Sequence, residues 1–264
     1  MTNSTVSLDD KYSIESGRIF VTGVQALARI PMVQRQRDVL EGLNTAGFIS
    51  GYRGSPVGGF DQQLWRAKKF LEQNHIRFQP GLNEDLAASA IWGSQQTNLH
   101  EGGKYDGVFA IWYGKGPGVD RCGDVFKHGN MSGPAKHGGV LLIAGDDHAA
   151  KSSTVPHQSE YAFMDASIPV LNPAGVQDIV DYGILGFAMS RFSGCWVAFK
   201  TTAENMDSSA SIDVSPDRVK ISLPKFDMPE GGLSIRWPDD WIEQEHRLHQ
   251  YKLNACLLYT SDAA

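Results

Sequence analysis

The stretch from Tyr52 to Glu84, with the apolar run just before it, constrains the fold most, because it holds two strand-to-helix transitions. Gly47-Phe-Ile-Ser-Gly51 breaks into a glycine-rich segment ending at Gly59. A helically spaced segment and a short strand-like run follow before Glu84 stands at the head of another helix. Two transitions within about 35 residues are typical of a parallel α/β sheet. Since ligands bind beyond the carboxyl ends of such strands, Ser55 and Glu84 should share one edge.

The same alternation continues to about Val214. Further strands are expected at 18–21, 76–79, 108–113, 138–144, 168–171 and 195–199, with helices between them. We therefore predict an α/β fold: an open, mostly parallel sheet with helices on both faces. Pro31 should kink or break the helix near Ile30, and Gln34 to Arg37 should form its solvated face.

Composition excludes several classes of function. The net charge is -6 and no basic run occurs, so a nucleic-acid-binding surface is not expected. Three cysteines without C-x-x-C spacing indicate neither a disulfide framework nor a zinc or iron-sulfur site, and favour the cytoplasm. The first twelve residues lack the apolar core of a signal peptide, and no 18 apolar residues run together, so no membrane anchor is expected.

Four regions are expected along the chain. Residues 1–12 should be a disordered N-terminus and 13–214 the α/β domain. Residues 215–256 are rich in proline at first and are interpreted as a linker with the start of a following region, whose helix at 241–253 would lack a partner. Residues 257–264 look like a non-native tail.

Two glycine-rich turns are candidate ligand-binding segments. Gly51, Gly54, Gly58 and Gly59 allow close approach of a ligand to the backbone, although a plain strand-to-helix turn explains them equally well. Ser55 lacks the flanking glycines of a nucleophile elbow, which disfavours a serine hydrolase. The loop 115–121 after the strand at 108–113 matches neither a dinucleotide fingerprint nor a P-loop.

The acidic candidates have simple structural explanations. Glu84 is favoured electrostatically in the first turn of a helix and needs no catalytic role there. Asp146-Asp147-His148 invites a metal site, but adjacent side chains point to different sides, so a turn or capping role is favoured. His128, His137 and His157 are interpreted as loop or surface residues.

Five motifs in order nevertheless resemble a known family: Tyr52-Arg-Gly-Ser-Pro56, Asn83-Glu-Asp-Leu-Ala87, the segments 112–121 and 144–153, and Ile168-Pro-Val-Leu-Asn-Pro173. Together they resemble the amino-terminal, pyrimidine-binding domain of indolepyruvate ferredoxin oxidoreductase in its bacterial fused single-chain form, a 2-oxoacid:ferredoxin oxidoreductase. The resemblance covers residues 12 to 250.

The resemblance implies a thiamine diphosphate enzyme that oxidatively decarboxylates a 2-oxo acid, with aryl pyruvates such as indolepyruvate as substrates, coenzyme A as acyl acceptor and ferredoxin as electron acceptor. It implies that Glu84 hydrogen-bonds N1′ of the aminopyrimidine, so that the cofactor can lose its C2 proton. Ser55 would donate a hydroxyl to the oxo acid, and Arg53 would meet its carboxylate. Gly54, Gly116, Pro117 and Gly118 would lie against the cofactor.

Several parts of such an enzyme are missing from the sequence. No Gly-Asp-Gly diphosphate motif with its Mg²⁺ ligand and no cysteine motif for a 4Fe-4S cluster occurs. We therefore expect a fragment that is inactive alone and works within a longer polypeptide, as a homodimer joined through small-residue helix faces such as 84–94. The alternative is a noncatalytic α/β module that binds a phosphorylated metabolite or a protein partner at the same edge.

Overall fold

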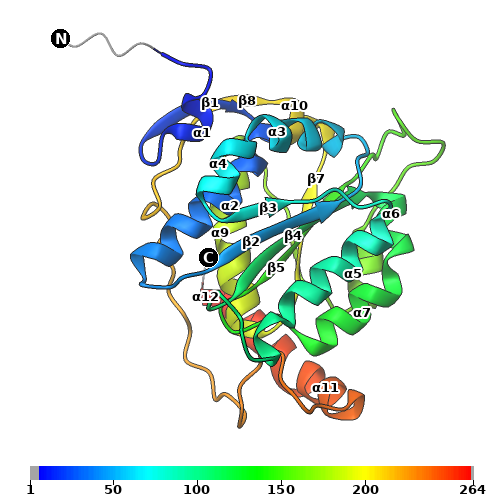
Figure 1. Ribbon diagram of the computed structural model, residues 1–264. Helices are drawn as coiled ribbons and strands as arrows, with labels where there is room; N and C mark the ends of the chain where they lie inside the picture. The colour runs from blue at the N-terminus through cyan, green and yellow to red at the C-terminus, as the bar shows by residue number, and fades with distance from the viewer. Residues whose placement is uncertain (1–5, 263–264) are drawn as a thin grey trace.

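The computed structural model describes residues 6–262, and its centre is a six-stranded parallel sheet (Figure 1). The strands stand in the order β3-β2-β4-β5-β7-β6. Their bounds are β2 Ala46–Gly51, β3 Ile76–Phe78, β4 Val108–Lys115, β5 Val140–Gly145, β6 Val170–Leu171 and β7 Val197–Thr201. The predicted fold class, a mostly parallel sheet with helices on both faces, is confirmed.

Helices cover both faces of this sheet. On one face lie α2 (Gly23–Leu40), α3 (Phe60–Arg66), α4 (Lys68–Gln73) and α9 (Val176–Ser193). The other face carries α5 (Glu84–Gln95), α6 (Gly116–Arg121), α7 (Gly123–Ser132) and α8 (Glu160–Asp165) (Figure 1). Shorter elements are α1 (Asp10–Ser13), α10 (Ala203–Asp207) and the single turns η1 (Val57–Gly59) and η2 (Thr97–Leu99).

Strand alternation divides the apolar side chains into two cores. In β4, Phe109, Ile111 and Tyr113 face the core beneath α2 and α9. Ala110 and Trp112 face the core beneath α5 and α7. Because successive side chains of a strand point to opposite faces, an unbroken apolar run is required wherever both faces are covered. This is the pattern that made 108–113 and 138–144 recognisable as strands.

The N-terminal part differs from expectation in two ways. The strand at 18–21 exists as β1 (Arg18–Thr22), but it pairs antiparallel with β8 (Ser209–Asp213) in a separate two-stranded sheet. Tyr12, expected to be disordered, is buried, and its hydroxyl donates to Gln63 Oε1 at 2.7 Å. Residues 1–5 lie outside the described residues.

The expected break at Pro31 was wrong, because α2 runs through it as a continuous helix. Ile30 and Pro31 are buried, and Ile30 fills the space beside Gly183 of α9, so tertiary packing outweighs the missing backbone hydrogen bond. The expected solvated face was also wrong: Gln34 and Arg35 are buried, and Arg37 donates to the carbonyls of Pro216 and Val219.

The C-terminal helices pack on the domain, in contrast to the expected helix without a partner. They are α11 (Trp241–Arg247), the π-helical turn η3 (Leu248–Lys252) and α12 (Leu253–Asp262). Leu248 and Cys256 are buried, and Lys252 Nζ donates to the carbonyl of Met131 at 2.7 Å, near the end of α7. That residues 257–264 form a non-native tail stays a prediction, and residues 263–264 lie outside the described residues.

Candidate functional site

The candidate site lies at the edge of the sheet where the parallel strands end. Arg53 and Ser55 follow β2, Glu84 follows β3, and Gly116 follows β4. The structure links these segments through close contacts. A Cβ on Gly54 would stand 2.8 Å from Lys115 Cβ, and a Cβ on Gly118 would stand 2.5 Å from Glu84 Cγ. The shared edge predicted from the sequence is therefore present.

Glu84 opens α5 as expected. The helix begins after Asn83, whose Oδ1 accepts the backbone N–H of Leu86 at 2.8 Å. Trp112 Nε1 donates to the Glu84 carbonyl at 3.0 Å, which fixes the backbone of this turn to β4. The Glu84 side chain is 15% exposed, and its Oε2 lies 3.9 Å from Arg121 Nη1. The largely buried carboxylate thus lies beside the second glycine turn, close to a cation.

The candidate substrate residues in the segment 52–59 are more exposed than Glu84. Arg53 and Ser55 are both exposed. Pro56 and Val57 lie against the end of β5, where a Cβ on Gly145 would stand 3.0 Å from each. The segment is therefore anchored beyond Ser55, while the two candidate substrate residues face solvent and are free to meet a ligand.

The expected loop at 115–121 is a helix from its second residue onward, since α6 spans Gly116–Arg121. Pro117 occupies the first turn, where a missing N–H costs nothing. Gly116, Pro117 and Gly118 therefore form the start of a helix at this edge, rather than a loop. The two glycines matter because neighbours fill the places where their side chains would stand.

The neighbour at Gly116 is His157, which the sequence had suggested was a loop or surface residue. Its Nδ1 would lie 2.2 Å from a Cβ on Gly116, and its Nε2 lies 2.8 Å from Asp120 Oδ2. The side chain is only 14% exposed. No periodicity in the sequence could have identified it, because the contact joins segments 37 residues apart.

Lys115 joins the same edge to the segment after β5. Its Nζ donates to Ser152 O at 2.9 Å and Oγ at 3.0 Å, and it lies 3.8 Å from Asp147 Oδ2. Asp147 also accepts the backbone N–H groups of Lys151 and Ser152, which lower its pKa. Asp147 thus has the turn role that the sequence favoured over a metal site.

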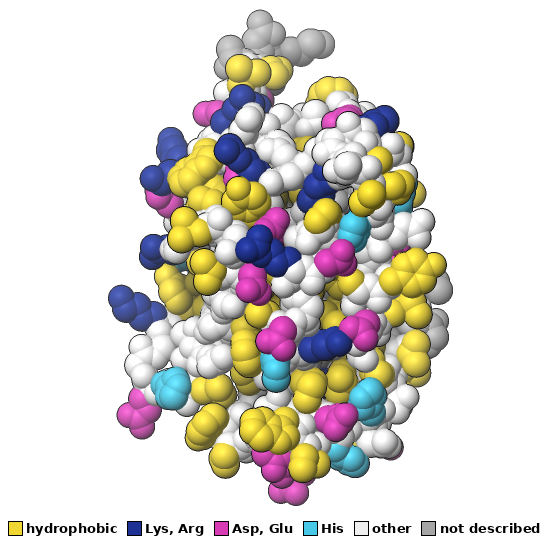
Figure 2. All heavy atoms as spheres, turned by 90° about the vertical axis from the view of Figure 1, so that its right-hand side faces the viewer, with side chains coloured by type: hydrophobic (Ala, Val, Ile, Leu, Met, Phe, Trp, Pro, Cys, Tyr) yellow, Lys and Arg dark blue, Asp and Glu magenta, His cyan; other side chains and the backbone are white. Residues whose placement is uncertain are grey.

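Neighbouring features complete the description of this surface. Among residues 6–262, no three His, Cys, Asp or Glu side chains are grouped so as to hold a metal ion. No described helix combines the length and apolar composition needed to cross a membrane. On the side that carries α5 and α7, acidic, basic and hydrophobic side chains are interspersed (Figure 2).

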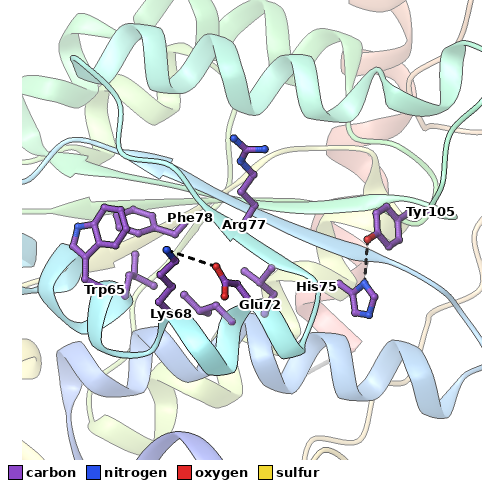
Figure 3. A pocket seen from close by; sticks show the side chains of 10 residues that line it. Trp65, Lys68, Glu72, His75, Arg77, Phe78 and Tyr105 are labelled. Carbon is purple, nitrogen blue, oxygen red and sulfur yellow. Dashed lines mark hydrogen bonds and ion pairs between the residues drawn. The ribbon is translucent and has the colours of Figure 1, made fainter.

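A cavity of about 530 Å³ lies elsewhere, beside the edge strand β3. There Trp65 packs edge-on against Phe78, and His75 is hydrogen-bonded to the Tyr105 hydroxyl (Figure 3). None of the candidate residues Arg53, Ser55, Glu84 or Gly116 to Gly118 lines it. The candidate site is thus an open edge and does not include this cavity.

Comparison with known proteins finds a similar fold but no protein of similar sequence. No protein-family model and no curated protein sequence matches the chain. Among solved structures, the chain is similar to a 2-oxoglutarate:ferredoxin oxidoreductase from Magnetococcus marinus with 2-oxoglutarate, coenzyme A and succinyl-CoA bound. The TM-score is 0.62 at 15% sequence identity, and the match covers 91% of this chain but 45% of that one. The chain thus spans less than half the length of that protein and shares its fold.

Proposed function

We propose that this chain is the pyrimidine-binding part of a thiamine diphosphate-dependent 2-oxoacid:ferredoxin oxidoreductase. The observation that carries the proposal is the Glu84 side chain, which packs against Gly118 at the edge of the sheet and is 15% exposed. The fold shared with a 2-oxoglutarate:ferredoxin oxidoreductase supports the class of enzyme. Indolepyruvate or another aryl pyruvate is proposed as substrate from the sequence motifs alone, with coenzyme A and ferredoxin as further reactants.

The residues at this edge fit the proposed cofactor. Gly118 leaves room for the Glu84 side chain, and Gly116 and Gly54 leave room for the side chains of His157 and Lys115. When bound, thiamine diphosphate supplies the carbon that attacks the 2-oxo group. Glu84 would hold a proton at N1′ of the aminopyrimidine, a charge-assisted hydrogen bond that contributes about 1.5 to 3 kcal/mol to binding. Of the three residues proposed to lie against the ring, Pro117 is exposed, whereas Gly116 and Gly118 are buried beneath His157 and Glu84.

The complete site requires more than this chain. We propose that residues 13–214 form the pyrimidine domain and that 215–256 lead into the rest of a longer polypeptide. The diphosphate, Mg²⁺ and 4Fe-4S sites would lie in those other parts, and the assembly would be a homodimer in the cytoplasm. The polypeptide encoded by the natural gene tests this: a Gly-Asp-Gly motif downstream supports it, and a gene ending at residue 264 contradicts it.

Glu84→Gln in the complete enzyme tests the role of the carboxylate. The substitution keeps the side-chain shape but removes the charge, so exchange of the cofactor C2 proton with D₂O should fall at least 100-fold, within the range for loss of general acid–base catalysis. Asp85→Asn is the control, because Asp85 is an acidic residue in the same helical turn. Near-normal exchange in Glu84→Gln would refute the proposal.

Ser55→Ala tests the substrate assignment separately. Loss of a hydroxyl that bonds the oxo acid should lower kcat/KM about tenfold, which corresponds to a hydrogen bond of about 1.4 kcal/mol. Cofactor binding should be unchanged, because the exposed Ser55 is proposed to bond the oxo acid and not the cofactor. Unaltered kinetics for the oxo acid would remove Ser55 from the site.

A further inference from the structure

Helix α6 is too short to fix its own position. It has six residues, Gly116–Arg121, and the Lys115 side chain makes no capping hydrogen bond at its start. A single helical turn has little stability without packing, because nucleation costs more than its few hydrogen bonds return. The orientation of α6 must therefore be set by the side chains that contact it.

His157 packs on one side of α6. Its ring covers Gly116, and its Nε2 is paired with Asp120, one turn further along the helix. The opposite nitrogen, Nδ1, is buried and has no hydrogen-bond partner within the described residues. A buried acceptor without a partner costs about 1 to 3 kcal/mol, so packing against α6 must outweigh that cost.

Glu84 contacts another part of the same helix. Its side chain fills the space beside Gly118, and its carboxylate lies 3.9 Å from Arg121. Consecutive residues of α6, Asp120 and Arg121, thus pair with His157 and with Glu84 respectively. If loss of the His157 contact shifts α6, Gly118 and Arg121, which both contact Glu84, would move together.

The segment that carries His157 is itself tied down. Ser159 donates its backbone N–H to Asp146 Oδ2 at 2.9 Å, which joins the two ends of the segment 147–158. Ser152 within it accepts from Lys115, the residue before α6. The green segment after β5 extends past the sheet edge beside α6 (Figure 1). Such closed loops are often functional.

We propose that His157 is a positioning residue for Glu84, acting through Asp120 and helix α6. This inference rests on the proposed cofactor role of Glu84. In this proposal, the segment 147–158 holds Gly116 to Gly118 of α6 in a fixed position beside Glu84. His157 itself need not touch the cofactor.

The test measures the Kd of thiamine diphosphate, with Mg²⁺ present, by calorimetric titration of the complete enzyme. His157→Leu should raise Kd about three- to tenfold, and Glu84→Gln by tenfold or more. Because His157 acts through Glu84, the double variant should match Glu84→Gln within about twofold. His157→Gln, whose amide can still donate to Asp120, should restore most of the affinity. Asp120→Leu, which removes the acceptor at a similar side-chain volume, should raise Kd similarly and provides a second route should His157→Leu fail to fold.

The control is His128→Leu, since His128 lies 3.6 Å from Asp124 within α7 and stacks on Trp92, two turns along α5 from Glu84. It should leave Kd unchanged. Wild-type affinity in His157→Leu and Asp120→Leu, or additive losses with Glu84→Gln, would overturn this inference alone. Wild-type affinity and exchange in Glu84→Gln would instead overturn the proposed function on which it rests.

Discussion

Gly118→Ala should damage the site while leaving the fold nearly intact. The new Cβ would stand 2.5 Å from Glu84 Cγ and 2.9 Å from its Oε1. Carbon atoms need about 3.5 Å, so the Glu84 side chain must move by about 1 Å. It can do so, because the atoms that clash belong to a flexible side chain and not to backbone. A displacement of that size at a reacting group can cost about 100-fold in rate.

The stability cost of the same change is small. Moving Glu84 sacrifices a long contact to Arg121, which is 57% exposed and contributes about 0 to 1 kcal/mol. An off-rotamer side chain adds about 0.5 to 1.5 kcal/mol, and replacing glycine by alanine in a helix returns about 0.5 to 1 kcal/mol. The net loss of stability should be at most about 2 kcal/mol. Urea unfolding followed by tryptophan fluorescence measures it.

Gly93→Ala is the matched control, because Gly93 lies in α5 with no atom within 4 Å of its added Cβ. It should leave C2 exchange unchanged and stabilise the protein by about 0.5 to 1 kcal/mol. Gly118→Ala should slow C2 exchange in the complete enzyme about 100-fold. Normal exchange, or a loss of several kcal/mol in stability, would show that Glu84 does not occupy the place beside Gly118.

Two further predictions concern buried charges. Arg191→Ala should reduce the free energy of unfolding by about 3 to 5 kcal/mol, because Asp38, which accepts from Arg191 at 2.6 and 2.9 Å, would be left buried without a cation. The pair of Arg218 with Asp181 is more exposed, so Arg218→Ala is a control that should cost under about 1 kcal/mol. Burial lowers the pKa of Lys252 to about 7, so the unfolded chain binds one more proton above that pH and stability should rise from pH 7 to 8. Urea midpoints measured at pH 7 and pH 8 should show this rise, and Lys252→Met should remove it. The same rise in Lys252→Met as in the wild type would contradict the burial of a neutral amine.

The edge of the sheet was predictable because it depends on local pattern. Apolar runs buried on both faces identify β4 and β5, and the chain must turn where each run ends, so Ser55, Glu84 and Gly116 were placed together without any coordinates. The cap at Asn83 also depends on local pattern, since its side chain accepts an N–H of its own helix.

The remaining features depend on contacts between distant segments. Pro31 stays within a helix because α9 packs along it, and Arg37 is covered because residues 216–219 return over α2. Glycine and proline at 116–118 predict a turn, yet they begin a helix whose place is fixed by His157 and Glu84. In each case packing with a segment far along the chain overrides the local preference, and a single sequence carries no signal for it.

The charges at this edge weigh against the rival function, a module that binds a phosphorylated metabolite here. Glu84 contributes a carboxylate at 15% exposure, Asp120 adds one from α6, and Asp147 adds one from the segment after β5. Two of the nearby cations are engaged: Lys115 with Ser152 and Asp147, and Arg121 with Glu84. A phosphate would meet repulsion from these carboxylates, which the exposed Arg53 at the same edge would offset only in part. An aminopyrimidine carries no negative charge and offers Glu84 a ring nitrogen to bind, so this edge suits the pyrimidine end of the cofactor while its diphosphate requires cations from another domain.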